Sequence, residues 1–441
     1  MSITAIFVPG IMGTELKLPS GEVVWPPKVS ETISGYGRIA ELQSSDLSAT
    51  RIIRNVSCVD FYKPMLSLFR QLGFESSGPK QLIEHPYDWR RDLFDLADGL
   101  ADRLDAVTAE EIVVVAHSMG GLISRLVLET DVYRTRDFFP KITKFIALAT
   151  PHNGAPLALA RVLGLDKALG ISAADFKRLS ENEDYPSGYQ LLPALGEDAC
   201  WDTSAGGELR PLDFYDPQVA GRLGMKPSLV ARTKALHEAL LAGAVPHHVR
   251  YFYFSGAGHK TATRVNVNGV QRQVVFTPDA GDGTVPMWSS LPRAEQKQVV
   301  VNEHANVFRG LPFKRVFFRL LGGDAGPPKE TLEALEAEAA ALNPLYISLQ
   351  KPIFDAGDPI EIVIASEALI TEIEGRLVFD RLTNNDRVEV AAAETRDLRY
   401  VGPGVYFFAM TLDVSLQPGF YELRYEGDRP MTERIVFVVA R

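Results

Sequence analysis

Ser118 lies in a segment whose residue types favour a nucleophile. Residues 112–116 are all apolar and fit a short buried strand, and residues 122–128 continue at helical spacing. A serine on the sharp turn between such a strand and helix needs small residues two positions away on either side. Ala116 and Gly120 meet this need, although glycine is usual at both positions. The segment therefore predicts a nucleophile elbow, and the alternative is an ordinary tight turn.

A serine becomes a good nucleophile when a histidine takes its proton and a carboxylate orients that histidine. His304 follows the apolar run 299–301 and precedes an amphipathic segment, where a base on a last-strand loop is expected. Asp282 lies between two glycines, which let the backbone turn its carboxylate inward, so we prefer it to Asp279. The alternatives are a surface histidine at a helix start and an aspartate in a solvated turn.

The order of residues and the first loop add to this assignment. His259 is the rival base, but it precedes Asp282, whereas the order serine, acid, histidine is expected in α/β-hydrolases. The N–H of Ile11, in the glycine-containing segment 8–13, would stabilise an oxyanion together with the N–H of Met119. A loop that only turns the chain is the alternative for this segment.

Strands and helices alternate along the first part of the chain. The predicted strands cover residues 3–8, 82–85, 112–116, 142–149, 250–254 and 298–301, and the predicted helices cover residues 61–72 and 92–107. This alternation is typical of a parallel sheet with helices on both faces. Together with the elbow, it predicts the α/β class and an α/β-hydrolase fold with a helical cap.

The length of 441 residues favours two domains. We expect residues 1–322 to form the α/β-hydrolase domain, with cap or lid insertions at about 13–57 and 155–248. A Gly/Pro-rich break leads into a linker and helix at 323–344. In residues 345–441 the pattern changes to period two, and about seven short strands predict an all-β, immunoglobulin-like sandwich.

The composition, 46% hydrophobic and 23% charged, is that of a globular protein. The net charge of −10 argues against a nucleic-acid partner and against attraction to anionic lipid, so any membrane contact would be hydrophobic. We find neither a signal-peptide pattern nor an apolar stretch of about 18 residues, so a cytoplasmic location is expected. Two cysteines form no disulfide framework, and neither a metal-ligand cluster nor a nucleotide motif is seen, so no metal or cofactor is expected.

Six motifs, in order, resemble the lecithin:cholesterol acyltransferase family, which includes lysosomal phospholipase A2 and the phospholipid:diacylglycerol acyltransferases. They are VPGIMG (8–13), PYDWR (86–90), AHSMG (116–120), ATPHNG (149–154), GDGTVP (281–286) and HANVF (304–308). The resemblance implies Ser118 as nucleophile, Asp282 as acid, His304 as base, and Ile11 and Met119 as oxyanion donors. It extends over residues 1–320 and leaves the C-terminal region outside.

The same motifs provide candidate substrate-binding residues. Trp25 lies where the family has a small lid or membrane-contact region, and His152 belongs to ATPHNG. Trp89, in PYDWR, either packs in the core or lines an acyl pocket, while its neighbours Asp88 and Arg90 are better explained as an ion pair. The animal enzymes close the lid with a disulfide, for which this chain has no cysteine pair, so the substrate identity is not transferred.

These observations predict a serine-dependent lipid-ester hydrolase or O-acyltransferase, similar to a phospholipase or lipase, that works through an acyl-enzyme on Ser118. The expected partner is a lipid or other acyl ester, including one at a membrane surface, and the C-terminal sandwich is a candidate site for an unidentified partner. The alternatives are a thioesterase or carboxylesterase of small esters, and a catalytically silent interaction protein. The acyl acceptor, water or an alcohol, stays open.

Overall fold

The computed structural model describes residues 2–56, 59–204, 206, 208–292, 296–323, 344–383, 388–431 and 434–441. The predicted linker and helix at 323–344 lie almost entirely outside these residues. None of the helices in the described parts of the chain combines the length and apolar character needed to cross a bilayer.

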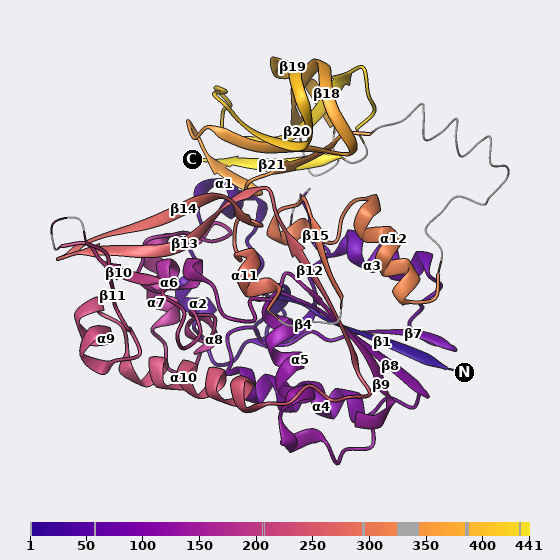
Figure 1. Cartoon of the computed structure of the whole chain (residues 1–441), viewed down its shortest axis with the longest axis vertical. Coiled ribbons are helices and arrows are strands. Elements are labelled where there is room, and N and C mark those ends of the chain that lie inside the picture. The colour runs from indigo at the N-terminus through magenta and orange to yellow at the C-terminus, as the bar shows by residue number, and fades with distance from the viewer. Residues whose placement is uncertain are drawn as a thin grey trace.

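A six-stranded parallel sheet forms the centre of the first part of the chain (Figure 1). Its strand order is β15-β12-β9-β8-β1-β7, and neighbouring strands pair in parallel throughout. The strands are β1 (Ile3–Val8), β7 (Lys80–Glu84), β8 (Glu111–His117), β9 (Ile142–Leu148), β12 (Arg250–Gly256) and β15 (Gln296–Val300). All six correspond to predicted strands, and the parallel sheet is confirmed.

Helices cover both faces of this sheet, because side chains that alternate along a buried strand point to opposite sides. In β8, Ile112 and Val114 pack into the core on the side of α4 and α5, whereas Val113 and Val115 pack on the side of α3 and α12. The four helices are α3 (Lys63–Gln71), α4 (Leu93–Asp105), α5 (Met119–Glu129) and α12 (Leu311–Leu320). The sheet therefore lies between two helical layers, and loops that follow the carboxyl ends of its strands are held at one edge.

The predicted lid region between β1 and β7 contains a small antiparallel sheet of order β3-β2-β4, a short β5–β6 pair and two helices. The elements are β2 (Thr14–Lys17), β3 (Val23–Trp25), α1 (Val29–Ser34), α2 (Ile39–Leu42), β4 (Ser48–Ile52), β5 (Asn55–Val56) and β6 (Val59–Asp60). None of these elements is predicted from the sequence.

The predicted cap between β9 and β12 is mostly helical. It contains α6 (Pro156–Val162), α7 (Ala173–Ser180), α8 (Ser187–Gln190), β10 (Cys200–Asp202), β11 (Arg210–Pro211), α9 (Pro217–Leu223) and α10 (Pro227–Ala242). A hairpin that the sequence analysis did not predict, β13 (His259–Asn268) and β14 (Gln271–Gly281), joins the cap, because β13 pairs with β10. Its loop begins with Gly269 at a φ of 60°, the position where type II′ hairpin turns prefer glycine.

The C-terminal region is mostly β, as predicted, and lies beside α1 and β14 (Figure 1). Its strands are β16 (Tyr346–Leu349), β17 (Ile353–Asp355), β18 (Ile360–Thr383), β19 (Val388–Leu412), β20 (Gly419–Gly427) and β21 (Ile435–Ala440). The expectation of about seven short strands is wrong, because β18 and β19 have 24 and 25 residues and form one long hairpin. Pairing irregularities between Ala365 and Glu372 let this hairpin continue where the alternating pattern breaks.

Candidate active site

Ser118 has the backbone conformation of a nucleophile elbow. It links β8 to α5 with φ of 52° and ψ of −126°, a conformation that costs a non-glycine residue about 1–3 kcal/mol. Two hydrogen bonds hold it there: the Ser118 N–H donates to the Leu148 carbonyl (2.8 Å), and the Ser118 carbonyl accepts from the Gly121 N–H (2.9 Å). The strained turn therefore places the hydroxyl at the carboxyl end of the sheet.

Close packing explains the small residues around Ser118. A Cβ atom on Gly120 would collide with the carbonyl oxygens of Val8 and Pro9, so only glycine fits there. On the other side of the serine, Ala116 is fully buried and lies in register with Val8 of β1 and Ala147 of β9. Alanine thus stands where glycine is usual, in register with another small residue on β9.

His304 lies between Ser118 and Asp282. Its Nε2 is 2.9 Å from the Ser118 Oγ, and its Nδ1 is 2.9 Å from the Asp282 Oδ2. The Asp282 side chain has no exposed surface, and its Oδ1 accepts hydrogen bonds from the N–H groups of Thr284 (2.9 Å) and Val285 (2.7 Å). A carboxylate fixed in this way keeps the proton on Nδ1, so that Nε2 is left to accept the serine proton.

The two rival residues lie elsewhere in the structure. The Asp279 carboxylate accepts a hydrogen bond from the Gly258 N–H (2.9 Å), and His259 contacts Ser348 and Gln350 of the C-terminal region. Of the two candidate acids, the structure therefore brings only Asp282 to His304.

The predicted oxyanion loop lies directly against the serine. A Cβ atom on Gly10 would be only 2.8 Å from the Ser118 Cβ, and the next residue, Ile11, lines the same cavity as Ser118. Met119 is the first residue of α5, where backbone N–H groups have no acceptor within the helix. Both candidate donors thus come from segments that the fold holds beside Ser118.

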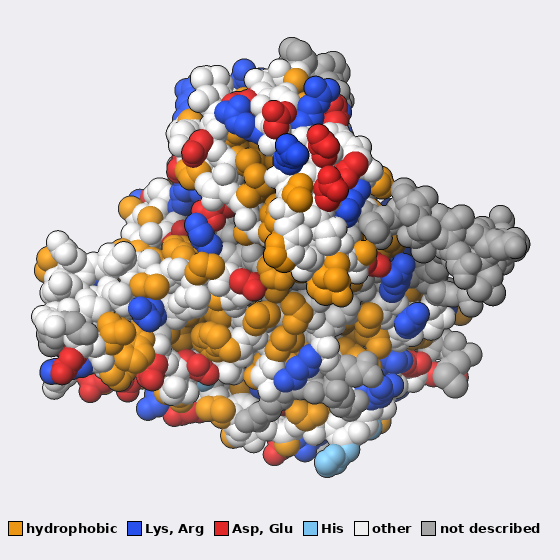
Figure 2. All heavy atoms as spheres, turned by 45° about the horizontal axis from the view of Figure 1, so that its top comes forward, with side chains coloured by type: hydrophobic (Ala, Val, Ile, Leu, Met, Phe, Trp, Pro, Cys, Tyr) orange, Lys and Arg blue, Asp and Glu red, His pale blue; other side chains and the backbone are white. Residues whose placement is uncertain are grey.

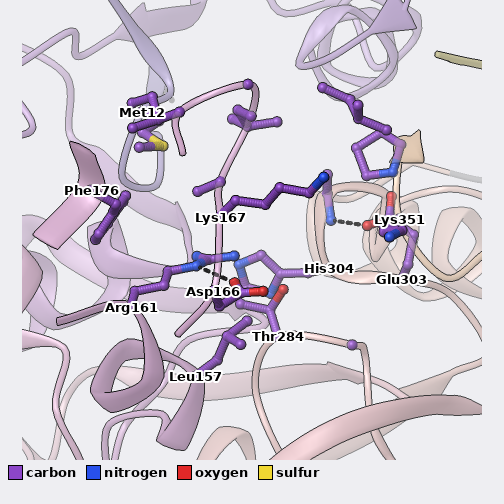
Figure 3. Close-up of a pocket in the computed structure, with 18 of the residues that line it drawn as sticks. Met12, Leu157, Arg161, Asp166, Lys167, Phe176, Thr284, Glu303, His304 and Lys351 are labelled. Carbon is purple, nitrogen blue, oxygen red and sulfur yellow. Dashed lines mark hydrogen bonds and ion pairs between the residues drawn. The ribbon is translucent and has the colours of Figure 1, made fainter. Parts of the chain in front are cut away.

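Ser118 and His304 line a cavity of about 790 Å³, part of which Figure 3 shows. Apolar side chains such as Leu157 and Phe176 contribute one part of its wall. Ion pairs contribute another part, among them Arg161–Asp166 (3.0 Å), Lys167–Asp355 and Lys351–Asp358 (3.0 Å). The cavity therefore offers an apolar space next to the serine together with charged groups that neutralise one another.

Residues 27–211 match the lecithin:cholesterol acyltransferase family. The resemblance seen in the sequence motifs is confirmed for this segment. The matched segment includes Ser118 but ends before Asp282 and His304, whose assignment as partners of the serine rests on the geometry described above.

Among solved structures, similarities to this chain are found at low sequence identity. The structure titled the Tle4–Tli4 complex contains a chain with 13% identity and a TM-score of 0.53, with 71% of this chain and 96% of that chain covered. A gene product of Listeria innocua, lin2722, has 12% identity and a TM-score of 0.33, with 75% and 97% covered. At 13% identity, the similarity to the chain in the Tle4–Tli4 complex shows the fold alone. That fold agrees with the parallel sheet described above. Among curated proteins, none matches the chain.

The three residues that the acyltransferase motifs suggested for substrate binding do not line the cavity that contains Ser118. The Trp25 Nε1 donates to the Met12 carbonyl (2.8 Å), and the Trp25 and Trp89 rings pack edge to face at 5.5 Å. The buried His152 ring stacks on Tyr253 at 4.1 Å. Trp89 and His152 are thus packed in the core, whereas Trp25 lines a small apolar crevice next to the cavity.

Asp88 and Arg90 form the expected ion pair. The Arg90 Nη2 lies 2.7 Å from the Asp88 Oδ2, and Arg90 also donates to the carbonyls of Leu42 (2.6 Å) and Ser44 (2.8 Å). The guanidinium has no exposed surface and lies over the Tyr185 ring. This arginine ties the end of β7 to the lid region, which is a structural role.

A second hydrogen-bonded chain, through His117 and Tyr62, was not found from the sequence. The Tyr62 hydroxyl accepts from the Gly10 N–H (2.8 Å) and contacts His117 Nδ1 (2.8 Å), while His117 Nε2 contacts the His304 carbonyl (3.0 Å). A carbonyl only accepts, so the proton is on Nε2 and the tyrosine donates to Nδ1. Burial lowers the pKa of His117 to about 3, which keeps this ring neutral. The chain links the oxyanion loop to the base loop.

The elbow motif already contains His117, but it gives no role for this residue. Tyr62 is 55 residues away in sequence, and no local pattern marks it. Only the folded chain brings the two together.

Proposed function

We propose that this protein is a serine-dependent enzyme that transfers acyl groups from esters, as a hydrolase or an O-acyltransferase. The observation that carries this proposal is the hydrogen-bonded chain from Ser118 through His304 to the buried Asp282. It lies at the carboxyl end of a parallel sheet and opens into a cavity large enough for a substrate. The match to an acyltransferase family supports the same chemistry.

In the first half of the reaction, the Ser118 Oγ attacks the ester carbonyl carbon while His304 Nε2 takes the hydroxyl proton. The negative charge that develops on the carbonyl oxygen is stabilised by the N–H groups of Ile11 and Met119. When the tetrahedral intermediate collapses, the carbon–oxygen bond to the alcohol breaks and His304 gives its proton to the leaving oxygen. Asp282 stabilises the transient imidazolium, and the acyl group remains on Ser118.

In the second half, water or an alcohol attacks the carbonyl carbon of the acyl-enzyme while His304 takes the proton of the attacking hydroxyl. The bond from this carbon to the Ser118 Oγ then breaks, and His304 returns the proton to the serine. Water yields a carboxylic acid, and an alcohol yields a new ester, so the same residues serve both outcomes. The ratio depends on how well the cavity excludes water and binds an alcohol.

We propose a lipid ester as the substrate. The apolar wall of the cavity supports this choice, as does a small apolar crevice that shares Met12, Phe61 and Ile353 with it and would extend the space for an alkyl chain. Figure 2 shows apolar side chains gathered across the middle of one face, below the C-terminal region. Phe276, which lines the cavity, is itself 45% exposed. With a net charge of −10, contact with a lipid surface would rely on such apolar side chains.

A fluorophosphonate probe tests the serine mechanism, because it labels only an activated serine. We expect labelling of the wild type and of Ser124→Ala, and none of Ser118→Ala. Ser124 is a matched control, since it is also buried and its hydroxyl donates to the Gly120 carbonyl on the same helix. An unlabelled wild type would favour the catalytically silent alternative.

Mass spectrometry of products identifies the substrate and the acceptor. The protein is incubated with mixed phospholipids and neutral lipid esters, with and without an added long-chain alcohol, and Ser118→Ala is the blank. Free fatty acid indicates hydrolysis, and a new ester with the alcohol indicates acyl transfer. Turnover of acyl thioesters or short-chain esters, without turnover of any lipid, would overturn the lipid assignment in favour of the small-substrate alternatives.

A further inference from the structure

The C-terminal region touches the loop that carries the candidate base. The Ser348 Oγ, on β16, accepts a hydrogen bond from the N–H of Glu303 (3.2 Å), the residue immediately before His304. The same Oγ is 2.9 Å from the Nε2 of His259, at the start of β13. Ser348 is 7% exposed and His259 1% exposed, so water does not compete strongly for these bonds. One buried hydroxyl therefore joins the base loop, the cap hairpin and the C-terminal region.

Gln350 completes this contact from the other side of His259. Its Oε1 is 3.3 Å from His259 Nδ1 and accepts from the Lys260 N–H (3.1 Å), while its Nε2 donates to the Lys260 carbonyl (2.6 Å). Since Oε1 only accepts, the imidazole proton is on Nδ1, and Nε2 accepts from the Ser348 hydroxyl. The serine oxygen is then free to accept from Glu303. Burial lowers the pKa of His259 to about 4, so the neutral ring that this pattern needs is present at neutral pH.

Gln350 also packs on the loop that carries the candidate acid. A Cβ atom on Gly283, the residue after Asp282, would be 2.9 Å from the Gln350 Nε2 and 3.2 Å from its carbonyl oxygen. Gly283 has a φ of 88°, and its N–H donates to the Thr261 hydroxyl (2.9 Å), next to the same cap hairpin residues. The base loop and the acid loop thus contact Ser348 and Gln350, which lie two positions apart in one segment.

We propose that Ser348 is a positioning residue for the reaction, and that the C-terminal region completes the active site through it. This inference rests on the proposed function of Ser118. A hydroxyl that fixes the Glu303 backbone also fixes the place of His304 relative to Ser118, and displacements of about 1 Å in such a geometry cost up to about 10²-fold in rate. The region would therefore influence catalysis by holding the base loop in place, in addition to packing against the first part of the chain.

The test compares Ser348→Ala with Ser366→Ala, a matched control in the same region. Ser366 is also 7% exposed, and its hydroxyl contacts the N–H of Ala368 instead of the site. On a p-nitrophenyl ester we expect kcat of Ser348→Ala to fall by about tenfold, with KM within about twofold, because acyl transfer is impaired more than binding. Ser366→Ala should keep the wild-type kcat, and Ser348→Thr, which retains a hydroxyl, should recover most of the loss.

Thermal unfolding shows whether each variant is folded at the assay temperature. If Ser348→Ala is unfolded there, Gln350→Ala tests the same inference. This variant removes the other partner of His259, and we expect the same pattern of lower kcat at similar KM. A folded Ser348→Ala with wild-type kcat would overturn the inference. Fluorophosphonate labelling separates the two proposals: an unlabelled wild type refutes the proposed function, whereas equal labelling rates in wild type and Ser348→Ala refute only the positioning role.

Discussion

At the scale of single residues, the conformation of Ser118 and the burial of Asp282 do most to define the site. The strained turn aims the hydroxyl at His304, and Asp282 has no exposed surface from which water could weaken its bond to the imidazole. The proposed chemistry would therefore use groups whose positions are fixed before a substrate binds, as electrostatic preorganisation requires.

We expect Asp282→Asn to lower kcat by about 10⁴-fold, because an amide no longer holds the His304 proton on Nδ1. Asp279→Asn is the matched control, since Asp279 bonds to the Gly258 N–H instead, and its effect should stay within about tenfold. Ser118→Ala and His304→Ala should abolish turnover while the protein stays folded. Steady-state kinetics on a p-nitrophenyl ester check all four variants, and a larger loss in Asp279→Asn would reassign the acid.

Tyr62→Phe tests the second hydrogen-bonded chain. Loss of the hydroxyl leaves the Gly10 N–H and His117 Nδ1 without a partner, which should loosen the oxyanion loop and lower kcat by about tenfold with little change in KM. Tyr133→Phe is the control, because its buried ring carries a hydroxyl that bonds to Asp98 far from the cavity. If both variants behave alike in kcat, the chain through His117 has no role in the reaction.

We expect Glu303 to make the stability of the protein depend on pH. Burial is the largest cause that raises the pKa of this carboxyl from 4.5 to about 7, and it faces His304, Asp282 and Arg309. A folded-state pKa above the unfolded value means that the folded protein holds the proton more tightly. This contribution to stability is complete below about pH 4.5 and is lost as the pH rises through about 7.

Thermal unfolding of Glu303→Gln and wild type, side by side from about pH 5 to about pH 8, isolates this group. The amide does not titrate, so the melting temperature of wild type minus that of the variant should fall as the pH rises. A difference that stays constant over this range would show that Glu303 has the same pKa in the folded and unfolded states.

At the scale of elements, burial decides what the sequence reveals. The four central strands of the parallel sheet, β1, β8, β9 and β12, are largely buried on both faces, so their apolar runs stand out in the sequence. The edge strands β7 and β15 are partly exposed and contain fewer apolar residues, so their ends are predicted less closely. The β13–β14 hairpin is different: most positions of β14 are exposed or half-buried, and its polar and apolar residues do not alternate, so no strand periodicity marks it. The Gly269 turn was the one local signal available.

The site shows the same division between local and long-range information. Ser118, Asp282 and His304 lie in short motifs at turns after strands, and the order of those motifs made them recognisable. The contacts of Tyr62 with His117 and of Ser348 with His259 join residues 55 and 89 positions apart. Such pairs follow from how lid, cap and C-terminal region pack together, which no spacing in one sequence encodes.

At the scale of the whole molecule, four parts of the chain line the cavity. The loops at the carboxyl end of the parallel sheet supply Ser118 and His304, the lid region supplies Thr32, the cap supplies Leu157 and Phe176, and the C-terminal region supplies Ile353. Backbone and side-chain contacts hold this arrangement, among them the Arg441 N–H to the Ile33 carbonyl (2.8 Å) and the Lys167–Asp355 ion pair. Because the wall of the cavity comes from all of these parts, we expect residues of the C-terminal region to affect which substrate is preferred.

Ile353 tests this view, because it lines both the cavity and the apolar crevice beside it. We expect Ile353→Trp to fill the crevice and exclude the end of a long acyl chain. Each buried CH₂ group contributes about 0.8 kcal/mol, so excluding two of them should lower kcat/KM by about tenfold.

The loss should appear with p-nitrophenyl palmitate, which has a long acyl chain, and be absent with p-nitrophenyl butyrate. Val401→Trp, at a position on β19 that is 67% exposed, is the control and should leave both activities unchanged. Equal losses on both esters would indicate damage to the catalytic geometry instead, and an unchanged preference would mean that the acyl chain does not reach the C-terminal region.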